Sequence, residues 1–169
     1  MSARYECLQL GKQHDRRLFD CGVPVLNDYL SRSASQDVKR NVSAVFVMVP
    51  TSDPNRIAGF YTLCATSIEL AALPIEFAKQ LPRYPHVPGI LIGRLARDVE
   101  FPGLGSLLLA SALTRCVRAA KEIAASVVVV DAKDSAAHAF YTRFNFLKLP
   151  KINSRLFLPI ASAEKLFGS

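Results

Sequence analysis

The sequence lacks any long hydrophobic run, and this absence bears first on membrane proteins. No apolar stretch in the 169 residues reaches the about 18 residues that a membrane-spanning helix needs. The N-terminal stretch Met1–Cys7 also lacks the charged and then apolar plan of a signal peptide. Repeats and low-complexity tracts are missing too. We therefore expect a cytoplasmic protein with no membrane segment, folded as one domain over residues 1–169.

Cysteines are few and scattered, which argues against a metal site or a disulfide framework. No pair among Cys7, Cys21, Cys64 and Cys116 has the spacing of zinc ligands. No catalytic motif surrounds any of them, so nucleophilic chemistry on a thiol is not favoured. We expect reduced, mostly buried thiols and no bound metal.

Histidines are scarce as well, and no motif marks one as a general base. We expect His14, His86 and His138 at the surface. An enzyme that lacks a strong base needs an acceptor amine that is already largely neutral, because such an amine can attack without first being deprotonated. An α-amino group, with a pKa of about 7.7–8, meets that condition, whereas a lysine amine at about 10.4 does not.

Basic residues exceed acidic ones, with 21 Lys and Arg against 14 Asp and Glu, a net charge of +7 and a pI of about 9.5. This balance suits an anionic partner such as nucleic acid, a phosphorylated ligand or an acidic protein. A solvated basic surface with no such partner fits the charge equally well. Half of the residues are hydrophobic, which is enough for a sizeable core.

The hydrophobic pattern predicts an α/β protein with a mixed sheet. Strands are expected at 5–10, 42–49, 56–68, 89–97, 126–131 and 155–158. Helices are expected from Pro24, after Gly105, around Tyr141 and at 160–167. The strands at 42–49 and 56–68 should form a hairpin across the turn at 51–55. The proline-rich segment 73–88 is expected to hold a short helix and an irregular loop.

Gly103-Leu-Gly105 lies between a predicted strand and a predicted helix. Backbone N–H groups and the positive end of a helix dipole would face an anion there, and glycine allows a phosphate to approach closely. By itself the pair fits a structural turn just as well.

The stretch Ala137–Phe146, which reads A-x-x-F-Y-x-x-F-x-F, follows a predicted buried strand. A short helix here would set Tyr141 at the mouth of a sheet cleft. A tyrosine on such a helix is either a core or rim residue or a proton donor. Phenols have a pKa of about 10 and thiols of about 8.5, so a neutral phenol could protonate a leaving thiolate.

Three blocks together resemble the GNAT family of acyl-CoA N-acetyltransferases. They are Gly93-Arg-Leu-Ala-Arg-Asp98, the loop Glu100-Phe-Pro-Gly-Leu-Gly105 and the stretch Ala137–Phe146. The resemblance implies a single mixed sheet of six to seven strands, flanked by helices, with a splayed cleft for acetyl-CoA. The chain departs from the family pattern at four points. Glu100 replaces Arg or Gln, its loop is short, Asn145 stands for Gly, and Asp134 stands for Asn.

The same resemblance assigns roles to individual residues. Acetyl-CoA would be the co-substrate, Tyr141 would protonate the departing thiolate, and a backbone N–H near Leu95 would hold the thioester oxygen. Contacts to acetyl-CoA are implied for Leu95, Ala96, Arg97, Gly103, Leu104, Gly105, Ser106, Asp134 and Phe140.

The N-terminal half narrows the resemblance to the TacT-like toxins of bacterial toxin–antitoxin pairs. The matching blocks are Phe19–Gly22, Leu26–Leu30, Ile57–Leu63 and Leu81–Pro88. Membership implies acetylation of the α-amine of aminoacyl-tRNA, which stops translation, together with a ribbon-helix-helix antitoxin and a homodimer. Candidate tRNA contacts are Arg32, Lys39, Arg40, Arg83, Arg115, Arg118, Lys133 and Arg143, each of which could also be a plain solvated charge.

Two other functions stay open at this point. A GNAT enzyme with this sequence could acetylate protein N-termini or small amines instead of tRNA. The short loop with Glu100 also allows a binding module for nucleic acid or protein that has lost acetyl transfer. Turnover with peptides would favour the enzyme that acetylates N-termini or small amines. Failure to bind acetyl-CoA would favour the binding module.

Overall fold

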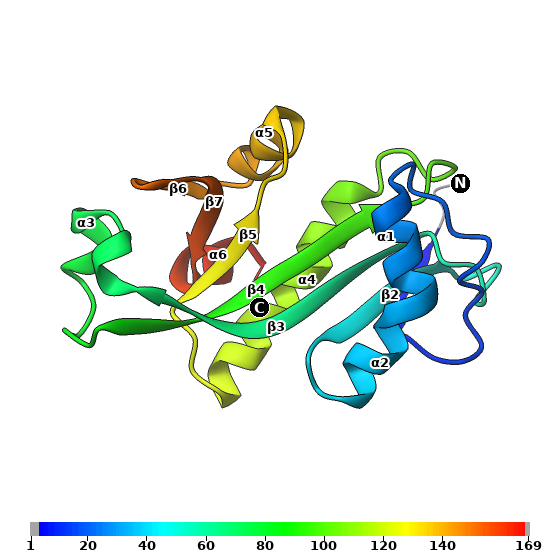
Figure 1. The fold of residues 1–169 in the computed structure, drawn as a ribbon, viewed down its shortest axis with the longest axis horizontal. Helices are drawn as coiled ribbons and strands as arrows, with labels where there is room; N and C mark the ends of the chain where they lie inside the picture. The colour runs from blue at the N-terminus through cyan, green and yellow to red at the C-terminus, as the bar shows by residue number, and fades with distance from the viewer. Residues whose placement is uncertain (1–3, 168–169) are drawn as a thin grey trace. The chain divides into compact units, whose positions relative to one another are not determined.

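The computed structural model of the chain describes residues 4–167. The stretch Met1–Cys7 was found above to lack the plan of a signal peptide. Its first three residues lie outside the described residues. Within residues 4–167 the chain forms a seven-stranded sheet in the order β1-β2-β3-β4-β5-β7-β6 (Figure 1). β4 and β5 pair in parallel, and the pairs β1–β2, β2–β3, β5–β7 and β6–β7 are antiparallel. The predicted mixed sheet with flanking helices is confirmed.

The strands are β1 Tyr5–Gln9, β2 Ala44–Pro50, β3 Gly59–Glu69, β4 His86–Arg97, β5 Val127–Asp131, β6 Leu147–Leu149 and β7 Ile152–Pro159. The helical segments are α1 Pro24–Asp28, η1 Tyr29–Ser33, α2 Ala34–Lys39, η2 Leu70–Ala72, α3 Ile75–Ala78, α4 Gly105–Glu122, α5 Ser135–Arg143 and α6 Ile160–Phe167. Each strand and helix predicted from the sequence is present. The sequence prediction missed β6 and began β4 at Gly89 rather than His86.

The described chain divides into two compact units. Unit 1 comprises Met1–Cys64 and Gly93–Ala112, and unit 2 comprises Ala65–Ile92 and Leu113–Ser169, apart from the terminal residues outside the description. β3, β4 and α4 each contribute residues to both units.

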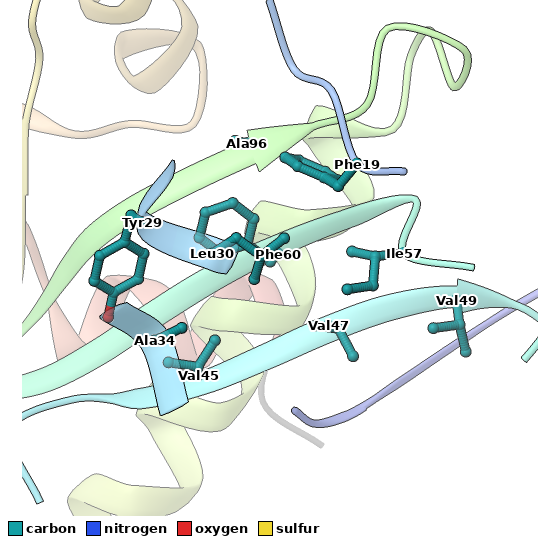
Figure 2. Packing of buried hydrophobic residues seen from close by; sticks show 10 residues of the cluster. All are labelled: Phe19, Tyr29, Leu30, Ala34, Val45, Val47, Val49, Ile57, Phe60 and Ala96. Atoms are coloured by element: carbon teal, nitrogen blue, oxygen red, sulfur yellow. The ribbon is translucent and has the colours of Figure 1, made fainter. Parts of the chain in front are cut away.

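The core of unit 1 lies between the first helices and the strands β2 and β3. Tyr29, Leu30 and Ala34 project from the helices toward Val45 and Phe60 of the sheet (Figure 2). All of these side chains are buried. Burial of such apolar side chains contributes about 1.5–3 kcal/mol each, so this face determines where the helices sit.

The helix that begins at Pro24 is interrupted by one wide turn. Pro24 occupies the first helical position, where its missing N–H costs nothing. From Tyr29 to Ser33 the chain is π-helical, and the N–H of Ala34 donates to the carbonyl of Tyr29. The helix then returns to α geometry through Lys39. No sequence signal predicted this turn.

The core of unit 2 forms around β5. The four valines Val127–Val130 are fully buried, as expected for a strand that is covered on both faces. Val127 and Val129 pack with Leu149 and Phe157 from β6 and β7. The antiparallel pairing of β5 with β7, from Val127↔Pro159 to Asp131↔Arg155, fixes this arrangement.

Two expectations about single residue types are wrong. His14, expected at the surface, is buried with 4% of its area exposed, and its Nδ1 accepts the N–H of Gly11 within the loop after β1. Of the four cysteines only Cys116 is buried, and Cys7, Cys21 and Cys64 are half-buried. All four are free thiols, as predicted.

Within residues 4–167, no helix is both long and apolar enough to cross a membrane.

The packing of Phe60 predicts a large loss of stability on truncation. Its ring is fully buried, edge-to-face with Phe19 at 5.4 Å between centroids and stacked with Tyr29 at 6.3 Å. Phe60→Ala should lower the free energy of unfolding by about 3–5 kcal/mol in urea denaturation. Val25→Ala, at a side chain that is 72% exposed, is the control and should change it by less than about 0.5 kcal/mol. Equal effects of the two variants would contradict the packing described here.

Candidate functional site

In unit 1, the candidate residues lie at the end of β4 and in the loop that follows it. The pairing of β4 with β5 covers Gly89–Ile92, and β4 then continues through Gly93–Arg97. Along this continuation Leu95 is half-buried, Ala96 is buried and Arg97 is exposed. A strand that outlasts its neighbour leaves backbone groups that an extended ligand can pair with.

The loop after β4 leads into the first turn of α4. Gly103 has a backbone φ of +82°, which residues other than Gly and Asn rarely adopt. A Cβ there would meet no atom within 4 Å, so the requirement for glycine comes from the backbone angle and the surrounding space stays open. Leu104 is buried, and α4 starts at Gly105 with Ser106 exposed. The first amides of this long helix have no acceptor within it, and they suit a phosphate.

A buried ion pair holds this loop. Asp98, the last residue of the Arg94-Leu-Ala-Arg-Asp98 block, is 1% exposed and lies 3.2 Å from Nη2 of Arg56, which is 8% exposed. Its Oδ1 accepts the N–H of Glu100 at 2.9 Å, and its Oδ2 accepts the N–H of Asp20 at 2.9 Å. One carboxylate therefore fixes the beginning of the loop, the guanidinium and the segment that precedes α1.

Glu100, the departure from the family pattern, is part of the same network. Its Oε2 lies 2.8 Å from Nη2 of Arg56. Arg56 also donates from Nη1 to the carbonyl of Leu18 at 3.1 Å. Arg56 is shared between Asp98 and Glu100, so one guanidinium partly offsets two carboxylates. The ion pair holds the Glu100 carboxylate against Arg56, and the open space at Gly103 with the first amides of α4 fits the pyrophosphate of acetyl-CoA.

A second contact fixes the middle of the β4 continuation. The guanidinium carbon of Arg94 lies 3.5 Å from the centroid of the Tyr29 ring, within range of a strong cation–π interaction. The Tyr29 hydroxyl donates to Oδ2 of Asp37 at 2.8 Å. Burial, followed by this hydrogen bond, raises the pKa of Tyr29 to about 12. The residue before Leu95 is thereby tied to the π-helical turn.

In unit 2, the candidate residues lie on α5. Asp134 caps the helix by accepting the N–H of Ala137 at 2.8 Å, so this departure from Asn preserves an N-cap. Asn145, where Gly is usual, has φ +70°. Between these two ends the helix carries Phe140 and Tyr141, whose rings meet edge-to-face at 5.2 Å.

Tyr141 is 8% exposed and packs against Phe146 as well, at 5.4 Å between ring centroids. Burial raises its pKa to about 12, so the phenol is protonated throughout the neutral range. Among residues 4–167 its hydroxyl has no hydrogen-bond partner. The group is thus a neutral donor whose proton is not committed to another residue.

The predicted tRNA contacts are spread over both units. In unit 1, Arg32, Lys39 and Arg40 are exposed on η1 and at the end of α2. In unit 2, Arg83, Arg118, Lys133 and Arg143 are exposed and Arg115 is half-buried. The Arg143 guanidinium lies 5.8 Å from the centroid of the Phe140 ring.

Arg83 lies in the wall of an open cavity of about 750 Å³ in unit 2. Lys79, Tyr84 and His86 share this wall, and Tyr84 is 70% exposed. An exposed ring beside basic side chains is the combination that binds single-stranded nucleic acid.

Neither Asp98 nor Arg56 was predicted from the sequence to have a role in the site, although both lie at or next to the ends of predicted strands. Their signal was a charged residue at the end of an apolar strand, a pattern shared by many surface residues. In the part of the chain that the structure describes, no cluster of three or more His, Cys, Asp or Glu side chains could hold a metal ion.

No protein-family model matches the chain. Two curated relatives do match along nearly their whole length. The probable toxin TacT of Sinorhizobium fredii is 32% identical over 165 residues, covering 92% of this chain and 91% of that protein. The tRNA-acetylating toxin of Mycobacterium tuberculosis is 37% identical over 152 residues, covering 89% of each.

Solved structures of toxins are similar in fold. A tyrosine-to-phenylalanine mutant of KacT superposes with a TM-score of 0.89 at 28% identity, over 96% of this chain and 99% of that one. AtaT complexed with acetyl-methionyl-tRNAfMet superposes with a TM-score of 0.88 at 29% identity, over 98% of this chain and 99% of that one. AtaTR bound with acetyl-CoA superposes with a TM-score of 0.82 at 28% identity, over 98% of each chain.

The network around Asp98 predicts that removing its charge is costly. Asp98→Asn keeps the shape but leaves Arg56 buried with a weaker partner, so the free energy of unfolding should fall by about 3–5 kcal/mol. Asp131→Asn is the matched control, because Asp131 pairs with Arg155 at 2.8 Å on the surface, where an ion pair is worth about 0–1 kcal/mol. Chemical denaturation of the two variants measures the difference, and similar losses would rule out a special role for Asp98.

Proposed function

The chain belongs to the family of TacT-like, tRNA-acetylating toxins with the GNAT fold, and from this membership we propose that it acetylates the α-amine of aminoacyl-tRNA with acetyl-CoA. The observation that carries the proposal is the match to a tRNA-acetylating toxin over 89% of both chains. The blocked amine can no longer form a peptide bond, so the reaction stops translation.

For acetyl-CoA we propose the contacts that the resemblance implies. The backbone of Leu95, Ala96 and Arg97 pairs with the pantetheine arm, and this is supported by the continuation of β4 beyond its pairing with β5. The pyrophosphate binds at Gly103–Ser106, supported by the left-handed Gly103 and the first amides of α4. Asp134 and Phe140 of α5 complete the proposed set.

Tyr141 is the proposed general acid. The acceptor nitrogen attacks the thioester carbon, the carbon–sulfur bond breaks, and the departing thiolate takes the phenol proton. The Leu95 N–H holds the negative charge that develops on the thioester oxygen. The raised pKa of Tyr141 and its uncommitted hydroxyl support this role, because a donor must carry its proton at working pH. The acceptor amine returns a proton to the tyrosinate.

For tRNA we propose phosphate contacts from the eight basic side chains named above. The exposure of seven of them supports the proposal, as does the net charge of +7, whereas Arg115 is half-buried. The cavity beside Arg83, with its exposed Tyr84, has the character expected for the single-stranded acceptor end.

We further propose that residues 1–169 act as one acetyltransferase domain in the cytoplasm, as a homodimer controlled by a ribbon-helix-helix antitoxin. Support for an antitoxin comes from the relatives, which are toxins, and from the AtaTR assembly among the similar structures. An adjacent gene for a short ribbon-helix-helix protein and a dimeric mass in solution are the observations expected.

The function is tested by incubating pools of charged tRNA with the protein and labelled acetyl-CoA. Label should appear on aminoacyl-tRNA and be absent from uncharged tRNA, because the acceptor is the α-amine. Peptides with free N-termini, offered in parallel, report on the alternative acceptor. Acetylation of peptides together with no acetylation of any aminoacyl-tRNA would contradict the proposal.

Removing the phenol hydroxyl tests the acid. Tyr141→Phe should lower the rate of acetylation by about 10²-fold or more, since the thiolate must then depart unprotonated. Calorimetric binding of acetyl-CoA should stay nearly unchanged. Tyr5→Phe is the control, because Tyr5 lies on β1, outside the proposed machinery. An unchanged rate in Tyr141→Phe would remove Tyr141 as the proton donor.

A further inference from the structure

A second basic cavity lies in unit 1, and none of its lining residues was predicted from the sequence to belong to a site. It has a volume of about 430 Å³ and is formed by the loop after β1 and the π-helical turn. Its lining residues are Lys12, His14, Asp15, Arg16, Arg17 and Ser31. Three of these six side chains are cations, and one is an anion.

The buried His14 carries a hydrogen-bond donor that has no acceptor. Its Nδ1 accepts the N–H of Gly11 at 2.9 Å, so in the neutral ring the proton resides on Nε2. Burial is the largest cause that lowers the pKa of His14, which keeps the ring neutral. Within residues 4–167, the buried Nε2 has no partner. An unsatisfied buried donor costs about 1–3 kcal/mol, so an acceptor oxygen at this position would be favoured.

The neighbouring cation is also without a carboxylate partner. Arg16 is half-buried, and burial lowers its pKa. Its guanidinium donates to the hydroxyl of Ser35 and to the carbonyl of Gly11, and among the described residues no acidic group forms an ion pair with it. A desolvated cation with neutral partners attracts an anion.

The single acid of the cavity does not neutralise this charge. Oδ1 of Asp15 accepts the N–H groups of Arg17 at 3.1 Å and Leu18 at 3.2 Å. This carboxylate therefore stabilises the turn of its own loop. Lys12 and Arg17 remain exposed at the rim of the cavity, and neither forms an ion pair within residues 4–167.

We propose that this cavity binds a backbone phosphate of the tRNA substrate, through His14 Nε2–H, Arg16 and the rim cations Lys12 and Arg17. The inference rests on the proposed function for the identity of the RNA. A phosphodiester offers only acceptor oxygens and negative charge, which matches a wall of donors and cations. Ser31 adds a hydroxyl, and the exposed Arg32 beside it continues the basic surface.

The experiment measures binding of uncharged tRNA over a series of salt concentrations. Each lost phosphate contact should reduce the slope of log K against log salt by about 0.7–0.9. Lys12→Ala and Arg17→Ala should each show part of this reduction, because both cations face the same phosphate, together with weaker binding at low salt. Lys165→Ala, at an exposed lysine of α6, is the matched control and should keep the slope of the unaltered protein. Acetyl-CoA binding should be the same in all variants.

A direct readout follows the His14 Nε2–H proton by NMR in isotope-labelled protein. Its resonance should shift when tRNA is added, and His14→Asn should remove it while keeping an acceptor for the Gly11 N–H. Titration with inorganic phosphate separates the two sources of the anion. A shift with phosphate and none with tRNA would overturn the proposal.

The two proposals fail in different ways. Equal salt slopes for Lys12→Ala, Arg17→Ala and Lys165→Ala would overturn the phosphate site, even if the protein acetylates aminoacyl-tRNA. Absence of acetylation with normal, cavity-dependent tRNA binding would overturn the proposed reaction and leave the RNA site standing. A protein that binds no tRNA would contradict both.

Discussion

The contact between Asp98 and Arg56 is the constraint on which the glycine loop of unit 1 depends. A buried carboxylate and a buried guanidinium are stable only when their remaining hydrogen-bonding positions are filled. Here the Asp98 carboxylate accepts the backbone N–H groups of Glu100 and Asp20. The Arg56 guanidinium donates one hydrogen bond to the carbonyl of Leu18. The start of the glycine loop and the entry to α1 are therefore held by the same charge pair.

The sequence was informative wherever local chemistry decides the outcome. Four consecutive valines specify a buried strand in any context, and Pro24 can begin a helix but not continue one, so β5 and α1 were predicted correctly. The three-residue β6 was missed because its length is too small to show a period. The prediction began β4 after Pro88, because proline has no N–H to donate to a neighbouring strand. Near the end of a strand this missing hydrogen bond matters less, and β4 in fact begins at His86.

The candidate site was harder to predict because its charges act over long sequence separations. Gly103 was identified from residue type as a point where a phosphate can approach the backbone, and Asn145 as the residue that stands for Gly; both adopt a left-handed backbone. Arg56 is far in sequence from the Asp98 and Glu100 that it contacts, so no local pattern links them. His14 was expected at the surface because no local pattern predicts the burial of a polar ring. The roles of Tyr141 and of the acetyl-CoA contacts remain predictions.

The π-helical turn at Tyr29–Ser33 gives this segment one place where its length can change. A π turn holds one residue more than an α turn, so a chain one residue shorter here would close the same turn in α geometry. Ala34 would stay in the core, and Asp37 would stay near the Tyr29 hydroxyl. A deletion of one residue within the regular helix α2 would instead rotate the residues that follow by about 100°. When this chain is aligned with relatives that share the Tyr29 contacts, a gap of one residue should therefore fall in the π turn and not in α2.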